Sequence, residues 1–235
     1  MYYDQSKYDV RCEWGIAGIE HLGTDADVVI VVDVLSFTTC VDIAVGRGAR
    51  VLPYRFKDHS AIDFARMNGA IVAGDRGTGA DYSLSPASLE NMPQDTKVVL
   101  PSPNGAMLTL AAGKKGYVLA GCLRNASAVA TAANSGGKIL VVPSGERWND
   151  GHLRPSIEDL IGAGAIIRKL NGKRSPEAEI AVAAFERAEN TLQECLRDCA
   201  SGRELIERGY ERDVQIASAL DISHLAPSFD GMTFS

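Results

Sequence analysis

A carboxylate and three hydroxyls directly follow a run of apolar residues near the beginning of the chain. The run spans Val28–Val32, and the polar residues after it are Asp33, Ser36, Thr38 and Thr39. An unbroken apolar run predicts a strand that is covered on both faces, as in a parallel sheet. Open α/β sheets bind ligands at the carboxyl ends of their strands, where a carboxylate can hold a cation and hydroxyls and helix N–H groups can hold an anion. We therefore predict that this turn binds a metal together with a small anionic substrate.

Four further segments of the same kind follow short apolar runs. They contain small, hydroxyl, amide or charged residues and span residues 74–79, 101–105, 121–127 and 143–148. Helix capping and turn formation would explain the Ser, Asn and Gly of any one segment, but not the Asp, Glu and Arg as well. We therefore expect all five segments to converge on one anion-binding site. Together they supply the predicted substrate-binding residues, which are Ser36, Thr38, Thr39, Asn104, Gly105, Asn125 and Arg147.

Carboxylates near this edge are candidates for binding a metal and for moving protons; they are Asp33, Asp75, Glu146, Glu158 and Asp159. Magnesium prefers oxygen ligands and is often held by one or two carboxylates, with water and substrate in the other positions. Asp33 is the favoured ligand, because an unpaired carboxylate at a buried strand end is costly. Glu158 and Asp159 are adjacent on a predicted helix and point about 100° apart, so we expect one of them to be the second ligand. A solvated helix start is the alternative explanation of this pair.

Arginines near the same edge could bind the phosphate, carboxylate or sulfonate oxygens of a substrate, because the guanidinium group is a planar fork of donors. Arg76 and Arg124 are the stronger candidates, since each lies within a strand-end segment. Arg147 and Arg154 flank residues 148–152, which could fold over a ligand. Ordinary surface salt bridges explain these last two arginines equally well.

Short apolar runs alternate with helical segments along the first two thirds of the chain. The expected strands span residues 28–32, 50–54, 70–73, 97–100, 117–120 and 138–142, and the expected helices 39–46, 60–68, 105–112 and 126–133. This alternation is typical of α/β proteins, and we predict a three-layer α/β/α fold with a mostly parallel central sheet. Residues 9–19 are expected to add an edge strand. A helical C-terminal third follows, with helices at 156–170, 176–196, 201–208 and 211–220 and a short strand near 224–226.

The composition indicates a globular protein and excludes several other classes. The chain has 235 residues, of which 46% are hydrophobic and 23% charged, and its net charge is −6. We expect one α/β domain over residues 1–235, with no membrane span, no signal peptide and a cytoplasmic location. An acidic chain without a dense Lys/Arg cluster is not expected to bind nucleic acid. The 5 cysteines and 4 histidines are too dispersed for a disulfide framework or a histidine metal centre. The apolar helices of the last third would serve a homodimer interface or the core equally well.

Several familiar catalytic and phosphate-binding motifs are absent from the sequence. It has no Gly-x-x-x-x-Gly-Lys-Ser/Thr loop, no Gly-x-Gly-x-x-Gly after the first apolar run and no Gly-x-Ser-x-Gly. Leu35, rather than a second Asp, lies two residues after Asp33, so the usual pattern for a covalent phospho-aspartate is missing. Cys122 and Arg124 are too close together for a cysteine-dependent phosphatase loop. For a phosphate ester substrate, we therefore favour direct attack of water on the phosphorus atom over a covalent intermediate on the protein.

The order of these segments resembles the 2-phosphosulfolactate phosphatase family along nearly the whole chain. The resemblance covers residues 31–39, 74–77, 84–86, 102–105, 123–129, 145–146, 157–167, 201–209 and 221–223. It implies an α/β fold with a magnesium-dependent site that removes phosphate from 2-phospho-3-sulfolactate, releasing 3-sulfolactate on the way to coenzyme M. The residues for which it implies a role are Asp33, Arg76, Asn104, Asn125, Glu158 and Asp159.

The chain departs from the pattern of this family in two places. Ser36 stands where an Arg is usual, and residues 74–78 are Gly-Asp-Arg-Gly-Thr where Gly-Glu-Arg-Gly-Gly is usual. The loss of an Arg from a site for a doubly anionic substrate bears more on the identity of the substrate than on phosphatase chemistry.

The sequence therefore predicts a Mg²⁺-dependent phosphatase that acts on a small phosphorylated acid. The predicted catalytic residues are Asp33, Asp75, Arg76, Arg124 and Glu146, and the predicted metal ligands are Asp33 with Glu158 or Asp159. The two arginines would stabilise the transferring phosphoryl group, and Glu146 or Asp75 would position the attacking water. Two alternatives stay open: a module that binds a phosphorylated or sulfonated metabolite without catalysis, and a lyase or isomerase that uses Mg²⁺ to hold an enolate.

Overall fold

The apolar run near the N-terminus forms the middle strand of a sheet in the computed structural model, which describes residues 2–235. Strand β2 (Val28–Val32) lies between β7 (Ile139–Pro143) and β6 (Tyr117–Gly121), and both neighbours run parallel to it. Every residue of β2 is buried. The prediction of a parallel strand covered on both faces is confirmed.

Further strands extend the sheet on both sides. Strand β1 (Val10–Cys12) is parallel to β7, and β10 (Ser228–Phe229) is antiparallel to β6, which gives the order β1-β7-β2-β6-β10. A second group of parallel strands has the order β3-β5-β4 and consists of β3 (Arg50–Tyr54), β5 (Lys97–Pro101) and β4 (Ile71–Val72). Phe234 forms bridges with both Val51 and Phe229, so the C-terminal segment joins the two groups. The sheet is mixed but mostly parallel, as predicted.

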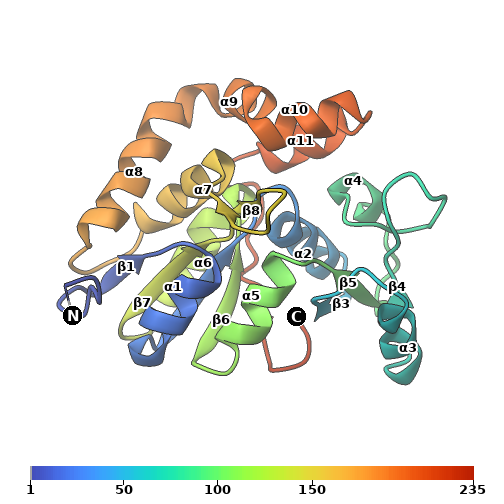
Figure 1. The fold of residues 1–235 in the computed structure, drawn as a ribbon, viewed down its shortest axis with the longest axis horizontal. Helices are drawn as coiled ribbons and strands as arrows, with labels where there is room; N and C mark the ends of the chain where they lie inside the picture. Colours follow the sequence, from blue (N-terminus) through green and yellow to red (C-terminus); the bar gives the residue numbers. More distant parts are fainter. Residues whose placement is uncertain (1) are drawn as a thin grey trace.

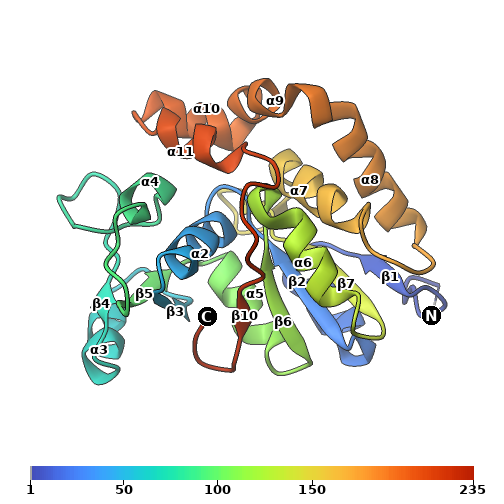
Figure 2. The ribbon, with the colours of Figure 1, turned by 180° about the vertical axis from the view of Figure 1, so that it is seen from behind.

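Alternate residues of β2 pack into two different helical layers. Val29 and Val31 belong to one hydrophobic cluster, and Ile30 and Val32 belong to another. The first layer contains α1 (Gly15–Leu22), α2 (Phe37–Gly46) and α5 (Gly105–Ala112), and the second contains α6 (Ala126–Ala133), α7 (Ile157–Ile167) and α8 (Pro176–Ala188). Helices α1 and α5 lie in front of the sheet in Figure 1, and α6 lies in front of it in Figure 2. The three-layer α/β/α prediction is confirmed.

The last helices of the chain arch over one edge of the sheet (Figure 1). This helical arm consists of α9 (Leu192–Asp198), α10 (Ala200–Glu207) and α11 (Glu211–Ala217). Helices α3 (Ser60–Met67) and α4 (Pro86–Leu89) lie beside the β3-β5-β4 group, and α11 packs against α4. A short hairpin of β8 (Glu146–Arg147) and β9 (Leu153–Arg154) follows β7. The 3-10 turns are η1 (Gly23–Asp25), η2 (Leu123–Asn125) and η3 (Glu189–Thr191).

Some of the predicted elements need correction. The expected helix 176–196 is two helices, because η3 separates α8 from α9; the Thr191 hydroxyl there donates to the Ala188 carbonyl at 3.4 Å, a type of bond that competes with helix formation. Residues 9–19 contain β1 and also the start of α1, and Gly15, at φ +60°, makes the turn between them. The short strand expected near 224–226 lies at β10, where Ala120 donates its N–H to the Pro227 carbonyl.

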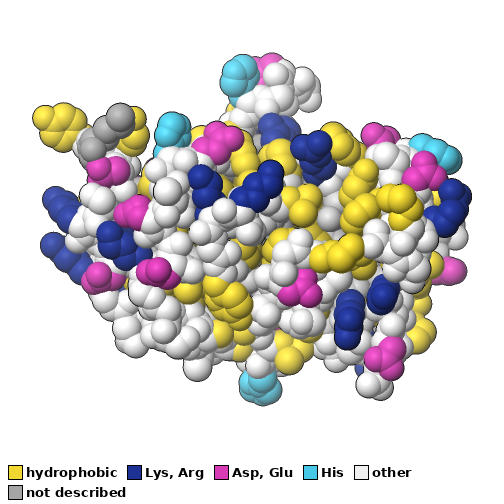
Figure 3. Space-filling model, turned by 90° about the horizontal axis from the view of Figure 1, so that it is seen from below, with side chains coloured by type: hydrophobic (Ala, Val, Ile, Leu, Met, Phe, Trp, Pro, Cys, Tyr) yellow, Lys and Arg dark blue, Asp and Glu magenta, His cyan; other side chains and the backbone are white. Residues whose placement is uncertain are grey.

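The face seen from below in Figure 3 lies opposite the helical arm. It shows Lys and Arg, Asp and Glu, and apolar side chains intermixed over its whole width. Among residues 2–235, none of the helices combines the length and the apolar character that crossing a bilayer requires.

Candidate active site

Four of the five strand-end segments meet in a cleft at the carboxyl edge of the sheet. They contribute Asp33 and Ser36 after β2, Arg76 after β4, Asn104 after β5 and Glu146 after β7. Helix α10 lines the other side of this cleft, which has a volume of about 490 Å³. The segment 121–127 after β6 does not contribute to its wall. The predicted convergence therefore holds for four segments and is wrong for the fifth.

The turn after β2 holds Asp33 in a fixed position. Its Oδ1 accepts the N–H of Phe37 and its Oδ2 accepts the N–H of Gly105, each at 3.0 Å. The Thr38 hydroxyl donates to the Asp33 carbonyl oxygen at 2.8 Å and braces the same turn. A Cβ atom at position 105 would lie 2.6 Å from Oδ2, so only glycine lets α5 approach the carboxylate this closely. Asp33 is 7% exposed, and it lines the cleft.

Two acids in the first turn of α7 are buried near Asp33. Asp159 accepts the N–H groups of Val34 and Gly145, both at 2.8 Å, and so joins the ends of β2 and β7. Burial raises the pKa of Asp159 well above its ordinary value. Glu158 is buried as well, and neither acid lies on the cleft wall. This pair is therefore not a solvated helix start, which was the alternative explanation.

Asp33 and Glu146, the two acids on the sheet side of the cleft, both have a raised pKa because they are buried and lie near other acids. Burial, with a smaller contribution from the Glu158 charge, raises the pKa of Asp33 to about 6 against the opposing effect of its two N–H bonds. Burial, followed by the charges of Asp33 and Glu158, raises the pKa of Glu146 to about 7. The Asn104 amide donates to Glu146 Oε2 at 2.9 Å and partly opposes this shift. A pKa raised to about 7 suits a group that takes up and returns a proton near neutral pH.

Arg76 lies on the cleft wall and is held from two sides. Its Nε donates to Asp213 at 3.2 Å, and its Nη2 donates to the Ser36 hydroxyl oxygen at 2.7 Å. Asp213 is buried in α11, where it also accepts the Ser85 hydroxyl at 2.6 Å and the Ala87 N–H at 3.1 Å. The helical arm thus fixes a guanidinium group, which is a planar fork of donors, on the wall of the cleft.

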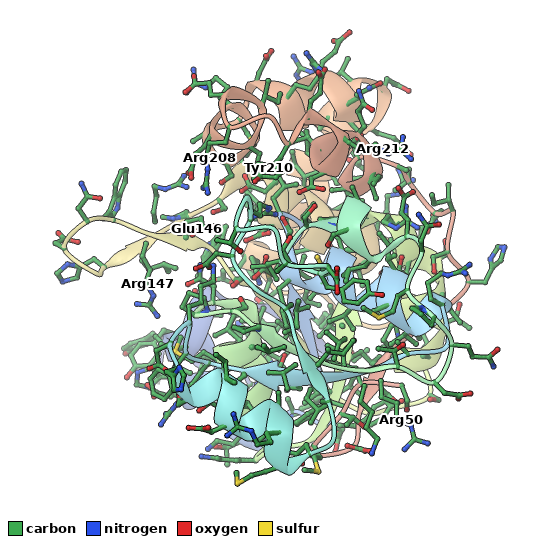
Figure 4. The ribbon with its side chains drawn as sticks, turned by 90° about the vertical axis from the view of Figure 1, so that its right-hand side faces the viewer. Arg50, Glu146, Arg147, Arg208, Tyr210 and Arg212 are labelled. Carbon is green, nitrogen blue, oxygen red and sulfur yellow. The ribbon has the colours of Figure 1, made fainter. Side chains whose placement is uncertain are left out.

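Four further cations line the cleft: Lys57, Arg147, Arg154 and Arg208. Figure 4 shows Glu146 between Arg208, on the helical arm, and Arg147, at the base of the projecting β8–β9 hairpin. Sequence reasoning missed Lys57 and Arg208. Lys57 lies three residues after β3, which is the signal that identified the other strand ends. Arg208 follows the end of α10, and no comparable signal in the sequence points to it.

The threonines and the asparagine that were predicted to bind substrate are used inside turns. Thr38 and Thr39 are fully buried, and their hydroxyls donate to the carbonyl oxygens of Asp33 and Val34 at 2.8 Å. Asn125 is also fully buried, and its amide holds the backbone of the turn after β6. Side chains that hydrogen-bond to nearby backbone groups take the place of helix or strand hydrogen bonds, and so they stabilise turns. The positions of Thr38, Thr39 and Asn125 correct the prediction that they contact substrate.

Arg124 and Asp75, two of the predicted catalytic residues, also lie outside the cleft. Arg124 donates its Nε to Asp42 at 2.9 Å and its Nη1 to the Ile216 carbonyl at 3.4 Å. Asp75 is exposed and lines an adjoining groove. The N–H of Gly105, predicted to meet the substrate, is bonded to Asp33 instead. Arg76 and Glu146 are therefore the better-placed members of the predicted arginine and carboxylate pairs.

The donor set of the cleft fits a hard divalent cation. Each oxygen of Asp33 keeps a lone pair after accepting one N–H group, and Glu146 lines the same cleft. Across residues 2–235, no three His, Cys, Asp or Glu side chains are grouped as a complete protein metal site. Magnesium is commonly bound through one or two carboxylates, with water and substrate completing its coordination. A bound cation would also offset the crowding that raises the pKa of Asp33 and Glu146.

Comparison with known proteins identifies the family. Residues 18–231 match the family model described as 2-phosphosulpholactate phosphatase. The chain belongs to the 2-phosphosulfolactate phosphatase family. As a member of the 2-phosphosulfolactate phosphatase family it is a phosphoric monoester hydrolase.

Relatives in the 2-phosphosulfolactate phosphatase family are similar over most of the chain. A probable 2-phosphosulfolactate phosphatase of Carboxydothermus hydrogenoformans is 30% identical over 207 residues, which cover 85% of this chain and 84% of the relative. The corresponding protein of Thermoplasma volcanium is 31% identical over 170 residues, or 69% of this chain and 77% of the relative. The 2-phosphosulfolactate phosphatase of Methanothermobacter thermautotrophicus is 28% identical over 207 residues, or 85% of each chain.

Proposed function

We propose that this protein is a Mg²⁺-dependent phosphatase that hydrolyses the phosphoric monoester of a small 2-hydroxy acid. The first substrate to test is 2-phospho-3-sulfolactate, because relatives of this protein are named 2-phosphosulfolactate phosphatase. The products would be 3-sulfolactate and phosphate, and the reaction would be of the type that occurs in coenzyme M biosynthesis. The observation that carries the proposal is that Asp33 and Glu146 share one cleft with Arg76. Acids that can hold a cation and activate water thus lie beside a donor for phosphoryl oxygens.

The cations of the cleft would bind and orient the ester. The free N–H groups of Arg76 form a planar fork that can bind phosphoryl oxygens. Lys57 and Arg154 line the same cleft and would neutralise the acid group of the substrate. Because Asp213 and Ser36 already hold Arg76, little rearrangement is needed when charge develops on the phosphoryl group.

Glu146 is the group that we assign to activate water. A carboxylate with a pKa of about 7 can accept a proton from a water molecule at neutral pH. The water oxygen forms a bond to phosphorus while the bond from phosphorus to the ester oxygen breaks, and the ester oxygen keeps the bonding electron pair. The proton on Glu146 then passes to that oxygen, which becomes the hydroxyl of the product. The Asn104 amide keeps Glu146 oriented throughout.

Asp33 would hold the magnesium ion, and the buried charge of Glu158 would support it electrostatically. When bound, magnesium supplies neutralisation of the phosphoryl oxygens and so favours attack by water. Asp159 is assigned a structural role, because both of its oxygens accept backbone N–H groups.

The test uses the purified protein with 2-phospho-3-sulfolactate, and phosphorus NMR monitors the release of phosphate. We expect inorganic phosphate as the phosphorus-containing product, loss of the reaction with EDTA and recovery with Mg²⁺. Acid quenching during turnover should trap no phosphorylated protein, because water attacks directly. Binding of the ester without phosphate release would favour the binding-module alternative. A rearranged phosphorus product would favour a lyase or isomerase.

A further inference from the structure

A second hollow, which we call the distal groove, opens from the cleft toward α3. It has a volume of about 550 Å³ and shares a basic mouth with the cleft, formed by Lys57, Arg76 and Arg208. Neither Asp33 nor Glu146 lines it, so the groove lies outside the proposed reaction centre. Sites for small organic ligands have volumes of about 300–1,000 Å³. The cleft alone is large enough for a short phosphorylated acid, and the distal groove is additional space.

The distal groove is basic at its mouth and apolar along one wall. The apolar wall consists of Ala61, Ile62, Val72, Leu84 and Pro101. Ile62 is 39% exposed although its neighbours in the wall are more buried. The polar part of the lining consists of Lys57, Asp58, His59, Asp75, Arg76 and Arg208. An apolar wall that faces polar groups can hold an organic ligand by both kinds of contact.

The charges in and around the groove are partly engaged within the protein. Two acids line the groove, Asp58 and the exposed Asp75. Asp58 accepts the N–H of Ser60 at 2.9 Å and so belongs to the start of α3. Arg208 donates to Glu204 at 3.0 Å. The mouth is therefore suited to one acid group of a ligand, and the wall beyond it is suited to an apolar group.

We propose that the distal groove binds the part of the substrate beyond its acid group, and that this part is apolar. The proposal rests on the proposed function, because it places the phosphoryl group beside Asp33 and Arg76. The acid group of a 2-phospho acid would then lie at the basic mouth, and its carbon chain would continue along the wall that contains Ile62 and Val72. The substrate class is a 2-phospho acid with an apolar extension of the size of a phenyl group.

A matched pair of esters, 2-phospholactate and 2-phospho-3-phenyllactate, tests this proposal. They differ only in the phenyl group, which should raise kcat/KM at least about tenfold in the presence of Mg²⁺, as expected when an apolar group enters an apolar pocket. Ile62→Glu places a charge on the groove wall and should abolish this preference. The same variant should change kcat/KM for 2-phospholactate by less than about twofold, because Ile62 is partly exposed and outside the cleft.

The matched control is Ile180→Glu on α8, which changes an isoleucine that is 65% exposed and lines neither hollow. It should leave both kcat/KM values unchanged. Equal kcat/KM for the two esters, or a preference that survives Ile62→Glu, would overturn the proposal and leave the phosphatase function intact.

If the protein hydrolyses none of the three esters, 2-phospholactate, 2-phospho-3-phenyllactate and 2-phospho-3-sulfolactate, the proposed function is contradicted instead. The groove is then tested by calorimetry with lactate and 3-phenyllactate. Tighter binding of 3-phenyllactate that is lost in Ile62→Glu would support the groove, and equal binding of the two acids would overturn it.

Discussion

Two arginines of this chain form ion pairs with buried aspartates. One pair lies beside the cleft, and the other, which we call the interior pair, lines neither the cleft nor the distal groove. Arg76 Nε lies 3.2 Å from Asp213 Oδ2, and Arg124 Nε lies 2.9 Å from Asp42 Oδ2. The aspartate side chain is 1% exposed in both pairs, and the arginine side chains are 12% and 16% exposed. Burial and pairing therefore do not distinguish an arginine that can bind substrate from one that cannot.

The other guanidinium nitrogens make the distinction. Arg76 directs Nη2 to Ser36 on the cleft wall, whereas Arg124 directs Nη1 to the Ile216 carbonyl in α11. Asp42 also accepts the Ser223 hydroxyl, so the interior pair ties α2 to the C-terminal segment. A buried ion pair is by itself a structural feature, and it becomes part of a site where its unused donors open into a cavity.

The largest contrast is expected at two buried carboxylates, one from each region. Asp33→Asn should lower kcat by about a thousandfold or more, because it removes the charge that faces the cleft. Asp42→Asn should leave kcat within about twofold. It should lower the free energy of unfolding by about 3 kcal/mol, because Arg124 loses its charged partner in a buried position.

Steady-state kinetics and urea denaturation of the same preparations measure both effects. If the Asp33→Asn protein is folded and fully active, the assignment of the reaction centre to this cleft is wrong. A large loss of kcat in Asp42→Asn would show instead that the interior pair acts on the site.

A smaller contrast is expected at the arginines themselves. Arg76→Gln should lower kcat/KM about 100-fold, because a preorganised donor to the phosphoryl group is lost. Arg124→Gln should keep kcat/KM within about twofold, while both variants lose stability because each leaves a buried aspartate without its cation. Kinetics on the folded fraction, with thermal denaturation as the stability measurement, separates the two roles. Equal losses of kcat/KM would mean that the distinction between the two arginines is wrong.

The elements that position the site could be predicted because their sequence patterns are local. The strands β2 and β3 and the helices α5 and α6 have the bounds expected from the sequence. Apolar runs and capping residues act over a few neighbouring positions, so the ends of these elements can be inferred without knowing what packs on them. Asp33 was identified for the same reason, since it directly follows a strand of five buried residues.

The roles of Arg76 and Arg124 could not be separated in this way, because both follow a strand in similar segments. The difference depends on Asp213, which is 137 residues from Arg76, and on Asp42, which is 82 residues from Arg124. The Thr38 hydroxyl was misassigned because of a short-range contact: it donates to the Asp33 carbonyl oxygen, five residues earlier, and is therefore not available to a substrate. The first contact is set by how the helical arm packs on the sheet, and the second by how α2 packs against the turn after β6. No local pattern specifies either of them.

The cleft acids also differ from Asp42 in the groups that surround them. Asp33 accepts backbone N–H groups and Glu146 accepts the Asn104 amide, whereas Asp42 accepts a guanidinium group. Their pKa values are raised from 3.8 to about 6 for Asp33 and from 4.5 to about 7 for Glu146. An acid with a raised pKa binds more protons in the folded than in the unfolded chain. Its contribution to stability is therefore fully present below its ordinary pKa and is lost as the pH rises through its raised pKa.

Glu146→Gln should consequently gain stability relative to the unmodified protein as the pH rises from about 5 to about 8, by about 1–3 kcal/mol without metal, because glutamine stays neutral throughout. Mg²⁺ should stabilise the unmodified protein more at the higher pH, since protons and the cation compete for the same carboxylate oxygens. Asp42→Asn should respond to Mg²⁺ as the unmodified protein does, because its carboxylate lies in the interior pair. Urea denaturation at both pH values, with EDTA or Mg²⁺, measures these differences. If the difference in free energy of unfolding between Glu146→Gln and the unmodified protein does not change with pH, the pKa of Glu146 is not raised by burial and neighbouring charges. The assignment of Glu146 as the group that accepts a proton would then be wrong.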